Sequence, residues 1–389
     1  MSEYEIVNFR AIDRPLSDKQ LAFMDRQSSR AEYTRWEFQV EYHYGSFRGD
    51  VDAMLRNGYD IYLTYSNYGT REIRMRLPNG LPFPKKVWSQ YLCQDGLKWN
   101  PDKGSKAGIL AVSPYLEDAH EAIWEFDDYL DAAAALREML LTGDLRALYV
   151  LWLCVASASR HEEDDDNPTE PPVPHGLGSC SASASSLLGF FEADPLLVDA
   201  AASGIPDFNA TSTFAESANA WRATLSNSQR NAILDRLISE DPVALKAELL
   251  AEIRESRAVA AWPVEPGART LMQLLEMCTR LRQINEEKRQ KQRATQAKRD
   301  AARAEKQRQA RMVEMKADPD RWLKHATGLV EQRGTENYRE AASILADLRE
   351  AVGGDAGNAI ARRHAKALAR KHPTLRILIS ALRKQALLD

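Results

Sequence analysis

A ribbon of charge in the second half of this chain limits its fold more than any other segment. It runs from Leu281 to Met312 and reads LRQINEEKRQKQRATQAKRDAARAEKQRQARM. Its residues are mostly good helix formers, and neither glycine nor proline interrupts them before Pro319. A helix that is polar on all sides either bridges packed parts of a protein through solvent or is not stable. We therefore predict one long charged helix over residues 282–318, with a length of about 50 Å.

Opposite charges recur at helical spacing along this segment. The pairs are Glu287 with Lys291, Arg282 with Glu286, and Asp300 with Arg303. Each such pair stabilises a helix by about 0.2–0.5 kcal/mol, so we expect ion pairs to stiffen this one. The apolar stripe that precedes it ends at Ile284, and a self-associating coiled coil needs a sustained apolar heptad. A coiled coil is therefore the weaker interpretation.

The formal net charge of −4 hides a strong asymmetry along the chain. Residues 282–389 hold 25 Lys and Arg against 14 Asp and Glu, a net charge of +11, which leaves −15 for residues 1–281. An acidic body and a basic tail favour partners of opposite sign for each part.

The first 112 residues predict an α+β head domain. Alternating apolar and polar residues predict strands at 4–12 and 36–44, and hairpins over 59–78 and 97–115. Ser17 is placed to cap a helix over 16–29, and Gly58 is expected to end a second helix in a left-handed conformation.

Residues 113–281 predict a helical domain. A helix is expected to begin at Pro114 with Ser113 as its cap, and to end at Gly143. The apolar run Ala147–Ala158 is too short to cross a bilayer and predicts a core helix. Residues from about 160 to 185 are acidic, then proline-rich, then small and polar, which indicates an exposed linker. Aspartates before proline, Asp194 and Asp241, mark two later helix starts.

Residues 319–389 predict a small basic module of about four helices. Its expected core includes five residues of one helix: Tyr338, Ala341, Ala342, Leu345 and Leu348. The fold class is therefore an α+β N-terminal domain, then a mostly α-helical body, a long charged helix and a small C-terminal helical module.

The four cysteines, Cys93, Cys154, Cys180 and Cys278, form neither a CxxC nor a Cys/His cluster. Zinc sites and disulfide frameworks need closer spacing, so unpaired thiols in a reducing cytoplasm are expected. The first residues contain no basic stretch followed by an apolar core, and no secretory signal is predicted. No cofactor and no membrane contact are expected.

Two stretches carry a resemblance to known proteins. FRAIDRPLSDKQ, EYHYGSFRGD and NYGTREIRMRLP together resemble the N-terminal region of an uncharacterised family of bacterial proteins. The tail from NYREAASILADLREAVG to ALRKQALL is similar to helical tails of some SWIM zinc-finger-associated proteins, although the CxC and CxH of the finger itself are absent. The resemblance implies a bacterial, cytoplasmic protein and carries over no catalytic residue.

Three groups of residues have a chemical alternative beside their structural interpretation. The acids of His161–Asp166 offer metal ligands, but consecutive acids in a linker point in all directions. His175 and Cys180 offer a nucleophile pair, but their segment is interpreted as linker. Aromatic residues between Trp36 and Tyr68 offer a stacking platform for single-stranded nucleic acid, but ordinary packing of strand residues is the stronger interpretation.

The strongest candidate binding surface lies in the tail. Its members are basic residues of one predicted helix: Arg362, Arg363, Lys366, Arg370 and Lys371. Residues 362, 366 and 370 are four apart and share a face, which would neutralise phosphates or acidic side chains.

The leading functional hypothesis is a non-enzymatic adaptor that links two protein partners through its head domain and its basic helical tail. A nucleic-acid-binding protein that uses the basic C-terminal helices is the first alternative. An enzyme with its site in the head domain is the second.

Overall fold

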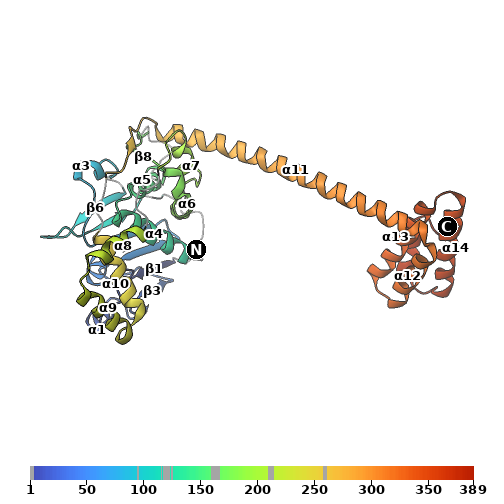
Figure 1. The fold of residues 1–389 in the computed structure, drawn as a ribbon, viewed down its shortest axis with the longest axis horizontal. Helices are drawn as coiled ribbons and strands as arrows, with labels where there is room; N and C mark the ends of the chain where they lie inside the picture. The colour runs from blue at the N-terminus through green and yellow to red at the C-terminus, as the bar shows by residue number, and fades with distance from the viewer. Residues whose placement is uncertain are drawn as a thin grey trace. The chain divides into compact units, whose positions relative to one another are not determined.

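The computed structural model describes residues 4–93, 96–114, 116, 123, 126–158, 167–208, 214–256 and 261–389. The chain groups into two compact units, Met1–Ile284 and Asn285–Asp389 (Figure 1). The predicted fold class is confirmed: an antiparallel sheet with helices comes first, and a mostly helical body, a long helix and C-terminal helices follow it.

One antiparallel sheet organises the first unit. Its seven strands in the described residues have the order β2-β3-β1-β4-β5-β7-β6. Their bounds are β1 Glu5–Arg10, β2 Glu32–Tyr33, β3 Glu37–Tyr42, β4 Ile61–Ser66, β5 Arg71–Leu77, β6 Leu97–Pro101 and β7 Gly108–Val112. Both predicted hairpins are confirmed, because β4 pairs with β5 and β6 pairs with β7. Strand β4 is buried along its whole length, as expected for a central strand covered on both faces.

Helices α1 (Asp18–Asp25) and α2 (Val51–Asn57) cover one face of this sheet. Val87 and Trp88 of the short α3 (Lys85–Trp88) pack against the core on the other face. Ser17 begins α1 as predicted, and its backbone N–H donates to Gln20 Oε1 at 2.8 Å. Gly58 does end α2, but its φ of 165° is extended and not left-handed, which corrects the expectation. Its lack of a side chain serves packing, because an added Cβ would lie 2.9 Å from Leu16 Cγ.

Helices α4 (Asp127–Leu141) and α5 (Arg146–Ala158) pack against the other face of the sheet, and α6 (Ser181–Phe190) and α7 (Leu197–Ala202) pack on these helices within the same core. The apolar run in α5 is a core helix as predicted, with residues 147–155 all buried. Sheet and helices share one hydrophobic core, so the expected boundary at residue 112 lies inside that core. The predicted helix start at Pro114 is wrong, because Pro114, Leu116 and Ile123 are not helical and α4 begins at Asp127.

The expectation of an exposed linker near residues 160–185 is wrong for residues 170–177. Strand β8 (Val173–Pro174) pairs with β9 (Val264–Glu265), and the 3-10 helix η1 (Leu177–Cys180) follows it. Glu170 is buried and accepts hydrogen bonds from Tyr149 at 2.5 Å and from Arg269 Nε at 2.7 Å. These contacts fasten the proline-rich segment to the core helix α5. Composition alone predicts a linker here because it does not record such pairings.

Three further helices belong to the first unit: α8 (Phe214–Thr224), α9 (Asn227–Ser239) and α10 (Pro242–Glu255). Asp241 caps α10 as predicted, accepting from Val243 N at 3.0 Å. Several large apolar side chains here are exposed, among them Leu234, Leu237 and Ile238.

The charged ribbon belongs to one continuous helix, α11 (Leu271–Ala317), which ends just before Pro319 as predicted. Residues 282–310 are all described and all exposed. The expected ion pairs of Glu287 with Lys291, Arg282 with Glu286 and Asp300 with Arg303 are not formed, since no N···O distance between these partners is within 4 Å. Asp300 accepts instead from Gln296 Nε2 at 3.0 Å, and Arg282 pairs with Asp194 at 2.5 Å.

The second unit ends in four helices: α12 (Pro319–Gln332), α13 (Thr335–Val352), α14 (Gly354–Lys371) and α15 (Arg376–Lys384). They form a hydrophobic core of their own, which Met315 of α11 joins. The five residues predicted for the core of α13 are all buried. Amphipathic spacing predicts these helices because each has one apolar face, and short segments connect them.

Candidate functional site

The predicted basic surface lies on α14, opposite the face that carries the buried Ala361, Ala365 and Leu368. Its members are all exposed: Arg362, Arg363, Lys366, Arg370 and Lys371. No carboxylate of the described residues lies within 4 Å of Arg363, Lys366 or Arg370. These three side chains therefore present positive charge to solvent.

The other two cations of this surface have partners within the module. Lys371 Nζ lies 2.8 Å from Glu331 Oε1 of α12, and this contact lowers the pKa of the Glu331 carboxyl. Arg362 Nη1 lies 3.9 Å from Asp389 Oδ1. The sequence placed all five residues on one helix, but these contacts come from distant parts of the chain. Arg363, Lys366 and Arg370 are consequently the better candidates for an external anion.

A second basic surface, which the sequence did not indicate, lies between α13 and α15. It is a groove of about 890 Å³ lined by these residues: Arg339, Ala342, Arg376, Ile377, Ser380, Ala381, Lys384 and Gln385. Three of the lining residues are cations, and none is an acid. Arg339 is 37 positions from Arg376 in the sequence. The signal was therefore not visible in helical spacing, which relates only neighbours within one helix.

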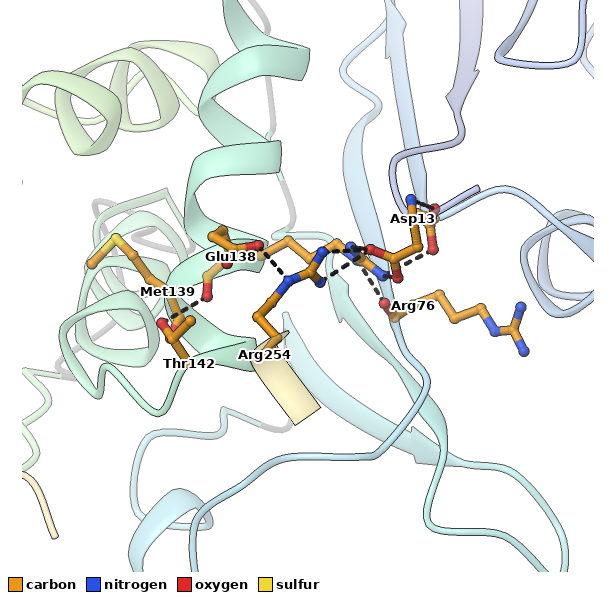
Figure 2. A network of polar contacts seen from close by, with 8 residues as sticks. Asp13, Arg76, Glu138, Met139, Thr142 and Arg254 are labelled. Carbon is orange, nitrogen blue, oxygen red and sulfur yellow. Dashed lines mark hydrogen bonds and ion pairs between the residues drawn. The ribbon is translucent and has the colours of Figure 1, made fainter. Parts of the chain in front are cut away.

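The first unit contains a buried network of charges (Figure 2). Arg137 of α4 is fully buried and donates to Asp13 at 3.1 and 2.6 Å, to Asp60 at 2.8 Å, and to the Arg76 carbonyl at 2.8 Å. Arg254 of α10 approaches the same Asp13 carboxylate and donates to it through two nitrogens, each at 3.0 Å. The network thereby ties α4 and α10 to the sheet.

The two carboxylates of this network have opposite pKa shifts. Burial by itself would raise the pKa of Asp13, but hydrogen bonds and charge from Arg137 and Arg254 outweigh it and lower the pKa to about 2. Burial raises the pKa of Asp60, and attraction by Arg137 offsets only part of that effect. Two carboxyls with separated pKa values are typical of acid–base sites. Here both carboxylate oxygens of Asp13 and both of Asp60 accept a hydrogen bond, which makes a structural role the better interpretation.

A pocket of about 480 Å³ lies beside this network, and α10 forms much of its wall. Ile12, Trp36 and Leu250 are among its lining residues, together with Glu138 and Arg254. Arg254 Nε lies 3.1 Å from Glu138 Oε2, so these two charges satisfy each other. The pocket therefore offers mainly apolar contact, and its paired charges are not poised for proton transfer.

The structure does not support a nucleophile pair of His175 and Cys180. His175 Nε2 lies 2.9 Å from Glu265 Oε1, and Cys180 Sγ donates to the Leu177 carbonyl at 2.9 Å. Burial raises the pKa of the Cys180 thiol to about 11, which keeps it protonated near neutral pH. The acids of His161–Asp166 lie outside the described residues.

The structure divides the aromatic residues predicted for a stacking platform. Phe38, Tyr59, Tyr62 and Tyr65 are buried, and the ring centroids of Phe9 and Tyr62 are 4.9 Å apart. Base stacking needs exposed ring faces, so packing within the core is the role of these four rings. Tyr44 and Tyr68 of the same group are exposed.

Metal sites and membrane spans are both absent from the described part of the chain. No group of three or more His, Cys, Asp or Glu side chains there is arranged to hold a metal ion. No helix among those residues combines the length and apolar character needed to span a bilayer. Comparisons with protein-family models, curated proteins and solved structures found no match.

Proposed function

We propose that this protein is a non-enzymatic adaptor that joins two partners, one through its first unit and one through its basic C-terminal helices. The observation that carries this proposal is the organisation of the C-terminal helices. They pack a hydrophobic core of their own. Arg363, Lys366 and Arg370 of α14 are exposed, as are the three cations of the α13–α15 groove, and no carboxylate of the described residues lies within 4 Å of these six side chains. Cations that have no acidic partner within the module are available for recognition by another molecule.

The charge distribution supports two different partners. The net charge is −15 for residues 1–281 and +11 for residues 282–389. Long-range steering depends on the sign of the local surface, so one partner cannot be attracted equally by both parts. The exposed residues 282–310 of α11 contribute no buried contact, which is consistent with a connecting role.

Affinity purification of the full-length protein tests the adaptor proposal. Two variants of equal charge change are compared with the wild type: R363E/K366E/R370E on α14 and R339E/R376E/K384E in the groove. We expect at least one variant to lose a defined group of co-purifying proteins by about fivefold or more while a second group is retained. If both variants capture the same proteins in the same amounts as the wild type, the C-terminal helices bind no partner and the proposal fails.

Nucleic-acid binding is the second candidate, and the three unpaired cations of α14 favour it. Contacts of this kind bind phosphates without reading the sequence, and their affinity falls steeply with salt. The full-length protein would then bind DNA or RNA at low salt. The R363E/K366E/R370E variant should reduce the slope of log affinity against log salt by about three. An unchanged slope in that variant excludes this use of α14.

A further inference from the structure

We propose that the groove between α13 and α15 is a docking site for an acidic amphipathic helix of a partner protein. The inference rests on the adaptor proposal and assigns a chemistry to the partner of the C-terminal helices. It concerns a surface that is separate from the basic face of α14.

The shape of the groove follows from small side chains on both helices. Ala342 of α13 and Ser380 and Ala381 of α15 form part of its lining. Such residues keep α13 and α15 in close contact below and leave a depression of about 890 Å³ above them. From Arg376 to Lys384 the lining of α15 extends for about 12 Å, which is slightly more than two helical turns. A helix laid along this depression would fit its length.

The cations of the groove are arranged along that same direction. Arg376 and Lys384 lie at the two ends of α15, and Arg339 lies on α13. No carboxylate of the described residues is within 4 Å of any of the three. Carboxylates two turns apart on a bound helix would meet Arg376 and Lys384, and a third would meet Arg339. The positive charge is therefore complementary to an acidic helix of a specific spacing.

The apolar part of the groove distinguishes a protein helix from a nucleic acid. Ile377 is 47% exposed although it lines the groove, and Ala342 and Ala381 lie with it. An apolar side chain of the partner would cover Ile377 and remove that surface from water. None of the lining residues is aromatic, so the groove offers no ring on which a base could stack.

Direct titration of the full-length protein with defined probes tests this inference. The first probe is a fluorescent helical peptide of about 18 residues, or five turns, built from Glu, Ala and Leu with the acids along one edge and the leucines along one face. The second has the same composition in scrambled order. The third is an oligothymidylate of similar net charge. Fluorescence anisotropy should detect binding of the amphipathic peptide, with an affinity that falls as salt rises.

Two pairs of variants locate the binding site. R339E/R376E/K384E should lower the affinity for the amphipathic peptide by at least about tenfold. R363E/K366E/R370E has the same change of net charge and should leave that affinity within about twofold of the wild-type value. Ile377→Ser should lower the affinity for the amphipathic peptide about threefold or more without altering the net charge. Val313→Ser is the matched control, because Val313 of α11 is exposed and does not line the groove.

Three outcomes would overturn the inference. Equal affinity for the scrambled peptide would mean that charge alone is recognised, and preference for the oligothymidylate would identify a nucleic-acid surface. Equal effects of the two charge-reversed triples would show that the groove has no special role. One of these outcomes can occur while a triple variant still loses a group of co-purifying proteins in the affinity purification. The adaptor proposal then stands, and only the assignment of the groove fails.

Discussion

Asp13 and Arg137 illustrate what buried charge does in the first unit. Arg137 is 1% exposed and joins Asp13, Asp60 and a backbone carbonyl. Removing one member of such a network leaves the others buried without a partner, which costs far more than a surface ion pair. The network therefore has a direct consequence for stability that can be measured by titration.

Asp13→Asn should destabilise the protein by about 2–3 kcal/mol at pH 7. The native pKa of Asp13 is about 2 and lies below the ordinary value of 3.8, so its ionised form stabilises the native state. That contribution is complete above about pH 5 and is lost as the pH falls through 4 towards 2. Urea unfolding at a series of pH values, followed by circular dichroism, measures the difference between variant and wild type.

The difference between wild type and Asp13→Asn includes a smaller effect on Asp60, because the charge of Asp13 is one cause of the raised pKa of Asp60. Asp235→Asn is the control, since Asp235 is exposed on α9 and its loss should change stability by less than about 0.5 kcal/mol. A pH-independent difference for Asp13→Asn would contradict the assigned role of the carboxylate.

Gly176→Ala should destabilise the first unit by about 1–3 kcal/mol. Its φ of 70° is left-handed, and an added Cβ would lie 2.5 Å from the Phe208 carbonyl oxygen. Gly178→Ala is a close control, because Gly178 has an ordinary φ and its nearest neighbour would be at 3.5 Å. Thermal unfolding compares the two variants, and equal midpoints would mean that this turn is not held by its glycine.

At the scale of elements, α11 depends on features that single side-chain pairs do not supply. Its expected ion pairs are absent, and residues 282–310 are exposed. Leu271, Leu274 and Cys278 are buried near its start, and Met315 is buried near its end. Packing at both ends offsets the unfavourable free energy of helix nucleation, and good helix formers then propagate the helix between these ends.

Backbone amides of residues 285–307 should consequently exchange with solvent at least about a hundredfold faster than those of α5 or α13. Local opening of this stretch exposes no buried side chain, so its free energy is small compared with that of a packed helix. Hydrogen exchange followed by mass spectrometry measures the difference. Protection of residues 285–307 equal to that of α13 would indicate that another molecule or another part of the chain covers them.

At the scale of the whole molecule, the two units have separate hydrophobic cores. One cluster joins the sheet to α4–α7, and another joins Met315 to α12–α15. Cores that share no buried side chains have no reason to unfold as one cooperative system. Function divided between two units would benefit from this independence, since each could bind without unfolding or rearranging the other.

Leu345→Ala should lower the unfolding midpoint of the second unit alone, and Leu148→Ala that of the first unit alone. Both leucines are completely buried, and such truncations cost about 2–5 kcal/mol. Calorimetry of the full-length variants should resolve two transitions and assign each to one unit. A single transition that shifts in both variants would show that the chain unfolds as one body.

The sequence by itself determined the elements whose signals are local. Alternation predicted β1 and the two hairpins, amphipathic spacing predicted the buried residues of α13, and the absence of glycine and proline predicted the continuous α11. These patterns suffice because each depends on neighbours within one strand or helix. The cations of α14 were found for the same reason.

Only the tertiary structure decided the features that join distant segments. The segment that contains Glu170 has the composition of a linker, yet Tyr149 and Arg269 hold it in the core. The groove exists because α13 and α15 pack together and bring Arg339 near Arg376. Burial, pKa shifts and grooves arise from contacts across the chain, and no local pattern of residues records which segments will meet.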